Sequence, residues 1–248
     1  MAYSVSYQLT HDIDWFAIHG RYLVHFASNG GLIPKDVKVR PNCQLRELLF
    51  NSNMIRPVET TVNHSFVAEW LTFKSYVLYH LWEFNNRELP SFNQHSNENI
   101  QKDAINIQPE LEQELSRSLD DGFGKFHDEN IKQYIQAFQK VATCGLISMD
   151  RITFGNEELD SIFSNHMQRI SKQYAIQHDT WFSEWNEFAD YQVIAFPQNR
   201  EEATIDSLFE RCTNNAVREK LNKINSENKE YLNKELQQLL KEKANVEQ

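Results

Sequence analysis

Apolar and polar residues alternate along the first thirty residues of the chain, which predicts β-strands there. Residues 5–9 alternate in this way, and apolar segments at 12–18 and 21–27 flank the dipeptide His19-Gly20. Successive side chains of a strand point to opposite faces, so alternation indicates a half-buried strand. Glycine accepts the positive φ that a two-residue turn requires. We therefore expect a β-hairpin that reverses at His19 and Gly20.

Longer apolar stretches with helical spacing predict helices over most of the remaining chain. The densest of them, residues 64–84, is too long for a strand and indicates a buried helix. Asp128, Asn156 and Asp179 are suited to cap three of the others. These further helices are expected at residues 45–51, 109–119, 128–144, 156–174, 179–188 and 204–243, and the polar stretch 85–108 predicts a long loop.

One more strand is expected near the end of the chain, at residues 191–196, where β-branched and aromatic residues precede Pro197. The predicted fold class is therefore α+β: a mostly helical domain with a small antiparallel sheet built on the N-terminal β-hairpin. This domain is expected to span residues 1–200. Residues 201–248 would form a C-terminal helical extension, whose narrow apolar stripe packs on the domain or on a partner.

Composition restricts the classes of function. The chain has seven glycines and no glycine-rich phosphate-binding motif, and its formal charge of −10 repels phosphate backbones, so general nucleic-acid binding is not expected. No apolar run approaches the roughly 20 residues that span a bilayer. Three widely separated cysteines form neither a disulfide framework nor a zinc motif. These features predict a cytoplasmic protein that does not enter a membrane.

The predicted hairpin brings together the side chains best suited to catalysis. A turn at His19-Gly20 places Asp14 opposite His25 and Asp12 opposite Ala27. A carboxylate beside an imidazole fixes its tautomer and raises its basicity, as general-base catalysis requires. Asp12, Asp14 and His25 are therefore the candidate catalytic residues. The same three groups could instead hold a divalent metal ion, or form a cross-strand ion pair on a solvated sheet face.

A candidate anion site follows the hairpin. Residues 35–56 carry five basic and two acidic side chains, although the chain as a whole is acidic. Glycines at the end of the second strand leave backbone N–H groups accessible to an anion. The candidate anion-binding residues are Asn29, Gly30, Gly31, Lys35, Lys38 and Arg40.

Three functions stay open at this point. The absence of a known catalytic signature and the uneven charge favour a non-catalytic binding protein that acts through a protein partner, using the acidic segment 157–210 or the C-terminal helix. The first alternative is a small hydrolase that uses Asp12, Asp14 and His25 on an anionic substrate. The second is a sensor of a nucleotide or another anion that does not turn it over. The residues identify no cofactor, and they leave open whether the protein is an enzyme.

Overall fold

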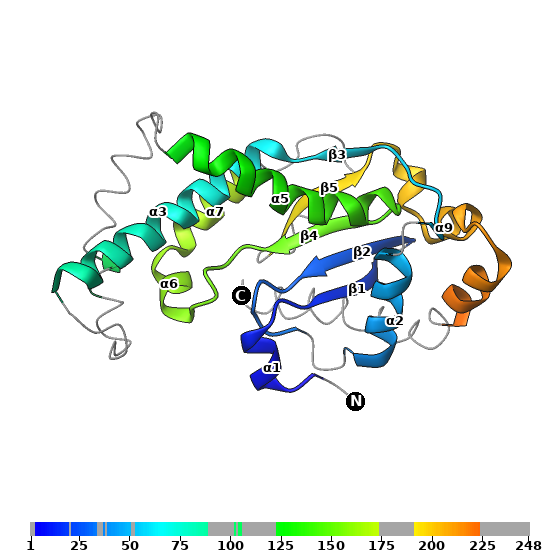
Figure 1. The fold of residues 1–248 in the computed structure, drawn as a ribbon, viewed down its shortest axis with the longest axis horizontal. Helices are drawn as coiled ribbons and strands as arrows, with labels where there is room; N and C mark the ends of the chain where they lie inside the picture. The colour runs from blue at the N-terminus through cyan, green and yellow to red at the C-terminus, as the bar shows by residue number, and fades with distance from the viewer. Residues whose placement is uncertain are drawn as a thin grey trace, which may run out of the picture. The chain divides into compact units, whose positions relative to one another are not determined.

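The structure is a computed structural model that combines helices with one β-sheet (Figure 1). It describes residues 3–19, 21–33, 37, 39–50, 53–88, 102, 104–105, 123–173 and 191–223. Among these residues, no helix combines the length and the hydropathy needed to cross a bilayer.

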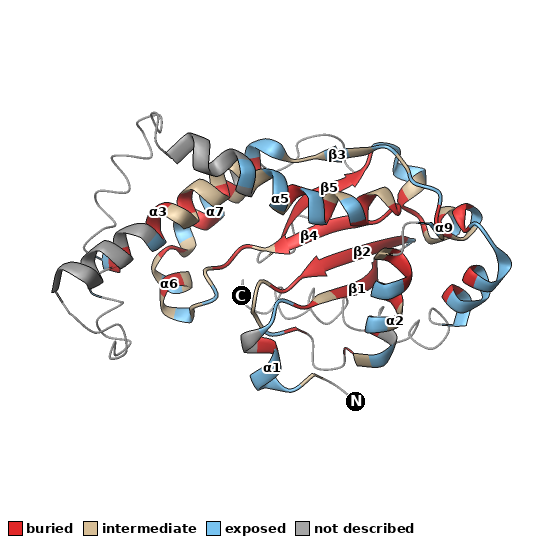
Figure 2. Ribbon diagram, viewed as in Figure 1, coloured by how far each residue is buried: buried red, intermediate tan, exposed pale blue. Residues whose placement is uncertain are grey.

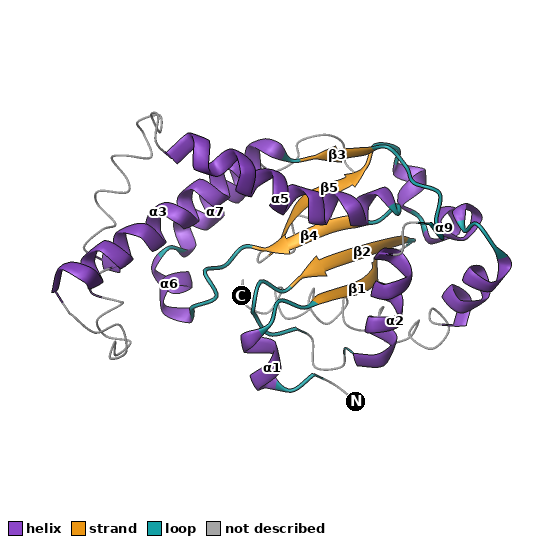
Figure 3. Cartoon of the chain, in the orientation of Figure 1, coloured by secondary structure: helices purple, strands orange, loops and turns teal. Residues whose placement is uncertain are grey.

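The strands form a five-stranded mixed sheet in the order β1-β2-β4-β5-β3 (Figure 3). They are β1 (Asp14–His19), β2 (Tyr22–Ala27), β3 (Thr60–Val62), β4 (Ile147–Arg151) and β5 (Tyr191–Pro197). The pair β2 and β4 is parallel, and the other neighbours are antiparallel. The α+β class and the N-terminal hairpin are thus confirmed. The prediction of a small antiparallel sheet is wrong, because β4 joins the hairpin to β5 and introduces a parallel pair.

The helices agree with the predicted pattern only in part. They are α1 (Val5–Thr10), α2 (Val39–Phe50), α3 (His64–Glu88), α5 (Phe123–Thr143), α6 (Glu157–Ile162), α7 (Ser164–Gln173), the 3₁₀ helix η1 (Arg200–Ala203) and α9 (Ile205–Arg211). The helix α3 and the Asn156 cap of α6 are confirmed, and the described side chains of α3 are buried on one face. Helix α5 begins five residues before Asp128, which is therefore not its cap. The helices predicted at 109–119 and 179–188 lie outside the described residues.

The predicted strand at residues 5–9 is wrong, because α1 occupies this segment. Its N-cap is Ser4, whose hydroxyl accepts a hydrogen bond from the backbone N–H of Tyr7 at 3.2 Å. Such a bond satisfies one of the N–H groups that the first turn of a helix leaves without a partner. Local capping therefore outweighs the alternating pattern.

The contacts within the chain divide it into two compact units. The sheet unit comprises Met1–Asn63, Ile135–Ile152 and Ala175–Gln248, and the helical unit comprises His64–Tyr134 and Thr153–Tyr174. All five strands belong to the sheet unit, and α3, α6 and α7 belong to the helical unit. The predicted boundary at residue 200 stays a prediction, because residues 224–248 of the extension lie outside the described residues.

The hairpin register differs from the predicted one by two residues. His19 pairs with Tyr22, and Phe16 lies opposite His25, so Asp14 lies opposite Ala27 and not opposite His25. His19 therefore belongs to β1 and not to the turn. A shift by two residues keeps every side chain on its predicted face, because the side-chain period of a strand is also two.

Both faces of the sheet are buried along β2 and β4, as Figure 2 shows. On one face, the rings of Trp15 and Phe26 stack with centroids 4.2 Å apart, and Tyr191 packs edge-on against both. On the other face, the ring of Phe138 from α5 lies 6.1 Å from that of His25. The predicted solvated face of the hairpin is therefore wrong, and its polar residues must satisfy their hydrogen bonds within the protein.

Candidate functional site: a polar cluster on the sheet

Polar side chains of four strands share one face of the sheet. The polar cluster consists of Asp14, His25, Ser148, Asp150 and Gln192. Asp14 and Asp150 both pair with Ala27 of β2, Asp150 also pairs with Gln192, and His25 pairs with Ser148 in the adjacent row. Directly paired residues point to the same face, so these side chains gather around the small side chain of Ala27. Asp14 is partly exposed, and the other four are buried.

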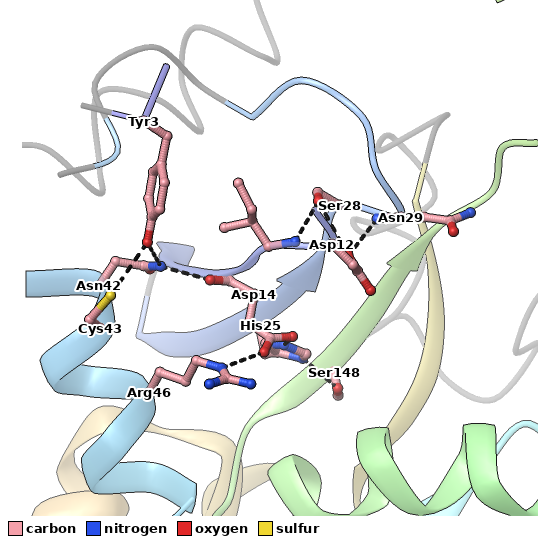
Figure 4. Close-up of polar contacts among 11 residues, drawn as sticks. Tyr3, Asp12, Asp14, His25, Ser28, Asn29, Asn42, Cys43, Arg46 and Ser148 are labelled. Carbon is pink, nitrogen blue, oxygen red and sulfur yellow. Dashed lines mark hydrogen bonds and ion pairs between the residues drawn. The ribbon is translucent and has the colours of Figure 1, made fainter. Parts of the chain in front are cut away.

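His25 links two members of the cluster (Figure 4). Its Nε2 lies 3.0 Å from Oδ1 of Asp14, and its Nδ1 lies 2.7 Å from Oγ of Ser148. An ionised carboxylate can only accept, so Nε2 donates to Asp14. In the neutral imidazole, Nδ1 then accepts the hydroxyl hydrogen of Ser148. A serine hydroxyl, an imidazole and a carboxylate thus form a continuous chain of hydrogen bonds.

Helix α2 holds Asp14 from the outer side. Nε of Arg46 donates to Oδ2 of Asp14 at 2.6 Å, and Nδ2 of Asn42 donates to its backbone carbonyl at 2.7 Å (Figure 4). Burial alone would raise the pKa of Asp14. Hydrogen bonds and electrostatic interactions with His25 and Arg46 outweigh burial and hold the pKa of Asp14 below its ordinary value of 3.8.

Asp14→Asn should destabilise the protein at neutral pH by about 1–3 kcal/mol, because the amide cannot accept from His25 and Arg46 as a carboxylate does. A lowered folded-state pKa means that Asp14 stabilises the fold fully above pH 3.8 and loses this contribution as the pH falls through the folded value. Urea unfolding of both proteins at pH 7 and at successively lower pH measures the difference, which should shrink in acid. A difference that does not change with pH would contradict the ionised Asp14.

Asp12, predicted to act beside Asp14, lies in a different set of contacts (Figure 4). Its Oδ1 accepts from the backbone N–H of Asn29 at 2.7 Å and from Oγ of Ser28 at 3.2 Å. The N–H of Gly31 donates to the carbonyl of Ser28 at 2.8 Å, and Asn29 and Gly30 between them have φ of 47° and 73°. Two positive φ values are typical of a type I′ turn. Asp12 thus fixes the turn that follows β2.

The predicted anion site is described only in part. Both donor nitrogens of Asn29 make a hydrogen bond within the protein, since its N–H donates to Asp12 and its side-chain amide donates to the carbonyl of Arg151 at 3.3 Å. Arg40 is exposed in the first turn of α2. Lys35 and Lys38 lie outside the described residues, so this anion site stays a prediction.

Sequence reasoning missed Ser148, Asp150 and Gln192 because it did not identify β4. The signal was present: Ser148 and Asp150 alternate with the apolar residues Ile147 and Met149. Arg46 was noted only as part of a basic region, because nothing in the sequence places it beside Asp14. Within the described ranges, no three or more side chains are grouped so that they could hold a metal ion.

The chemical capacity of the cluster is limited by its burial. An imidazole held by a carboxylate can take a proton from a serine hydroxyl, as serine hydrolases require. However, His25 is only 2% exposed and Ser148 is fully buried, so a substrate cannot reach the hydroxyl in this conformation.

Comparison with protein-family models, curated proteins and solved structures finds no match to this chain.

Proposed function

We propose that the protein is a non-catalytic binding protein that acts through a protein partner. The observation that supports this function is an exposed apolar surface on the sheet unit. Among the described residues of that unit, the large hydrophobic side chains that are exposed are Val5, Tyr7 and Leu32, at 59%, 45% and 52%. We call these three residues the α1 surface. Contiguous exposed apolar side chains mark protein interaction sites, and we propose that these three residues contribute to one.

Hydrogen bonds through Gln8 link α1 to the segment that carries Leu32. Its Nε2 donates to the carbonyl of Tyr3 at 3.0 Å, and its Oε1 accepts from the N–H of Ile33 at 2.8 Å. Gln8 therefore fixes the segment with Leu32 against α1, which carries Val5 and Tyr7. A surface that is ordered before binding loses less conformational entropy when a partner arrives.

The Tyr7 side chain is itself held in place. Its ring stacks on that of His11 at 4.0 Å and on that of Tyr3 at 5.8 Å, so three rings follow one face of the N-terminal helix. Tyrosine contributes much contact area with only two side-chain torsions, and it is enriched in the residues that dominate binding energies. We therefore expect Tyr7 to be the main apolar contact with the partner.

The sequence predicts two other contact surfaces, the acidic segment 157–210 and the C-terminal helix, and the α1 surface does not exclude either of them. The acidic segment 157–210 is divided between the two units, and residues 192–197 of it are buried in β5. Residues 224–248 of the C-terminal extension lie outside the described residues. Contact through either segment stays a prediction.

Tyr7→Ser is expected to abolish retention of the partner while leaving the melting temperature nearly unchanged. Affinity capture from the source cells, followed by mass spectrometry, would compare three proteins at equal loading. The matched control is Leu78→Ser, because Leu78 has a similar exposed fraction of 44% and lies on α3 of the helical unit. The proposal expects a protein that wild type and Leu78→Ser retain in stoichiometric amount and Tyr7→Ser loses. Equal retention by all three proteins, or by none, would contradict it.

Hydrolysis is the second candidate, and the hydrogen-bonded chain of Ser148, His25 and Asp14 favours it. In this function, Ser148 would be the nucleophile, His25 its general base and Asp14 the group that orients the imidazole. The polar cluster would then have to open, because Ser148 is buried. The test is His25→Ala: a catalytic role predicts lost esterase activity with an unchanged melting temperature, and a structural role predicts a large loss of stability.

A further inference from the structure

Two arginine side chains meet at one tyrosine at the turn end of the hairpin. Nε of Arg21 lies 3.4 Å from the hydroxyl oxygen of Tyr22, and Nε of Arg200 donates to the same oxygen. The Cζ atoms of the two guanidinium groups lie 5.5 Å and 5.6 Å from the centroid of the Tyr22 ring. Since both Nε atoms bind one oxygen, the two positive groups are held a few ångströms apart. This arrangement is independent of the polar cluster and of the α1 surface.

The backbone around the two arginines is fixed by the fold. Tyr22 is buried at the start of β2 and forms a β-bridge with Thr204. The N–H of Ile205 donates to the carbonyl of Arg21 at 3.0 Å. These bonds join the hairpin to η1, which carries Arg200, so segments almost 180 residues apart in the sequence present their guanidinium groups together.

Electrostatics favours an anion at this point. Two guanidinium groups at short range repel each other, and a bound anion would relieve this repulsion. Glu201 partly does so, because its Oε1 lies 2.7 Å from Nη2 of Arg21. Both side chains of this pair are more than half exposed, and exposed ion pairs are weak and screened by salt. A ligand with more charge and more acceptor atoms can therefore displace the Glu201 carboxylate.

We propose that Arg21 and Arg200 form a binding site for a phosphate group. A guanidinium presents two parallel N–H groups that match two phosphate oxygens, and a tetrahedral phosphate has enough oxygens to accept from two such groups at once. A carboxylate carries one negative charge on two oxygens, whereas a phosphate group carries more charge on more oxygens and so matches two guanidinium groups better. The net charge of −10 opposes binding of a polyanion such as a nucleic acid, so the ligand is a single phosphate, free or attached to a small molecule.

The test is titration calorimetry of the full chain at pH 7.5, with inorganic phosphate in one arm and adenosine monophosphate in the other. We expect saturable binding that weakens as the salt concentration rises. Equal affinity in the two arms identifies free phosphate as a sufficient ligand, and tighter binding of the nucleotide identifies a phosphorylated small molecule. Absence of saturable binding in both arms would overturn the proposal.

Four variants make the titration specific. Arg200→Gln and Arg21→Gln should each weaken binding at least tenfold. Arg218→Gln is the matched control, since Arg218 is also exposed in the sheet unit and its Nε donates to a backbone carbonyl, that of Phe209. Glu201→Gln should strengthen binding, because it removes the competing carboxylate. Weakening by Arg218→Gln to the same degree, or weaker binding by Glu201→Gln, would overturn the proposal, and unfolding curves would show that every variant is folded.

Discussion

Gly145→Ala should lower the free energy of unfolding by about 4 kcal/mol, the largest effect that we expect from a single methyl group in this protein. Gly145 follows α5 with φ of 89°, a conformation that residues with a side chain rarely adopt. A Cβ atom built there would lie 1.9 Å from Nη2 of Arg211 and 2.7 Å from the carbonyl oxygen of Glu202. The new methyl group would therefore displace the guanidinium as well as strain the backbone.

The Arg211 guanidinium cannot move without leaving several carbonyls unsatisfied. Arg211 is buried, and its side chain donates to the carbonyls of Cys144, Arg56 and Glu202 at 2.9, 3.0 and 3.3 Å. Each buried carbonyl that loses its donor costs about 1–3 kcal/mol. These bonds connect the end of α5, the segment before β3 and η1 to α9, so their loss would loosen four parts of the sheet unit together.

Gly30→Ala is the matched control for this prediction. Gly30 also has a positive φ, of 73°, but a Cβ atom there would have no neighbour within 4 Å. This variant should therefore show only the backbone strain, about 1 kcal/mol. Urea unfolding of the two variants measures the difference, which isolates the contribution of Arg211. Equal destabilisation of the two variants would show that the guanidinium is not essential to the fold.

His25→Ala should lower the free energy of unfolding by about 3 kcal/mol. The substitution removes a buried ring that contacts Phe16 and Phe138, with centroids 5.4 Å and 6.1 Å away. It also removes the hydrogen-bond partner of Asp14 and of the fully buried Ser148. A cavity and two unsatisfied polar groups would thus be created at one position.

A double-mutant cycle with Ser148→Ala would separate these effects. If the His25 and Ser148 side chains interact as the 2.7 Å contact indicates, their destabilising effects should differ from additivity by more than about 0.5 kcal/mol. Chemical unfolding of the wild type, both single variants and the double variant provides the four free energies. A stable His25→Ala protein that lacks an esterase activity of the wild type would favour the hydrolase over the binding protein.

The contact between Asp14 and His25 was predicted from the sequence although the predicted register was wrong. The hairpin reverses one residue later than expected, which shifts the partner of each residue by two, so Asp14 lies diagonally across from His25 and still reaches it at 3.0 Å. An even shift in register leaves each side chain on the same face of the sheet, and an odd shift moves it to the other face. The pattern of apolar residues determines which face is buried. The exact partner is set by the turn, and His19 could be read equally well as a turn residue or as the last residue of β1.

The rest of the cluster was missed, because the alternating pattern of β4 is short and the pairing joins distant segments. β4 has only five residues, and two of them, Ser148 and Asp150, are polar and buried. Polar residues make so short a segment look less like a buried strand. The hydrogen-bond partner of Ser148, His25, is 123 residues away in the sequence. The N-terminal helix was missed for the opposite reason: its cap at Ser4 is a local signal, but the alternation beside it was given more weight.

The parallel pairing of β2 with β4 also constrains the order in which the chain folds. The hairpin β1-β2 closes through contacts a few residues apart, whereas β4 reaches β2 only after the long excursion that contains most of the helical unit. Closing so long a loop has a high entropic cost, so contacts of this kind form late and slow the folding rate. During synthesis, one edge of β2 would therefore stay unpaired until β4 has been synthesised. Because this contact forms late, substitutions at Ser148 should increase the unfolding rate more than they decrease the folding rate.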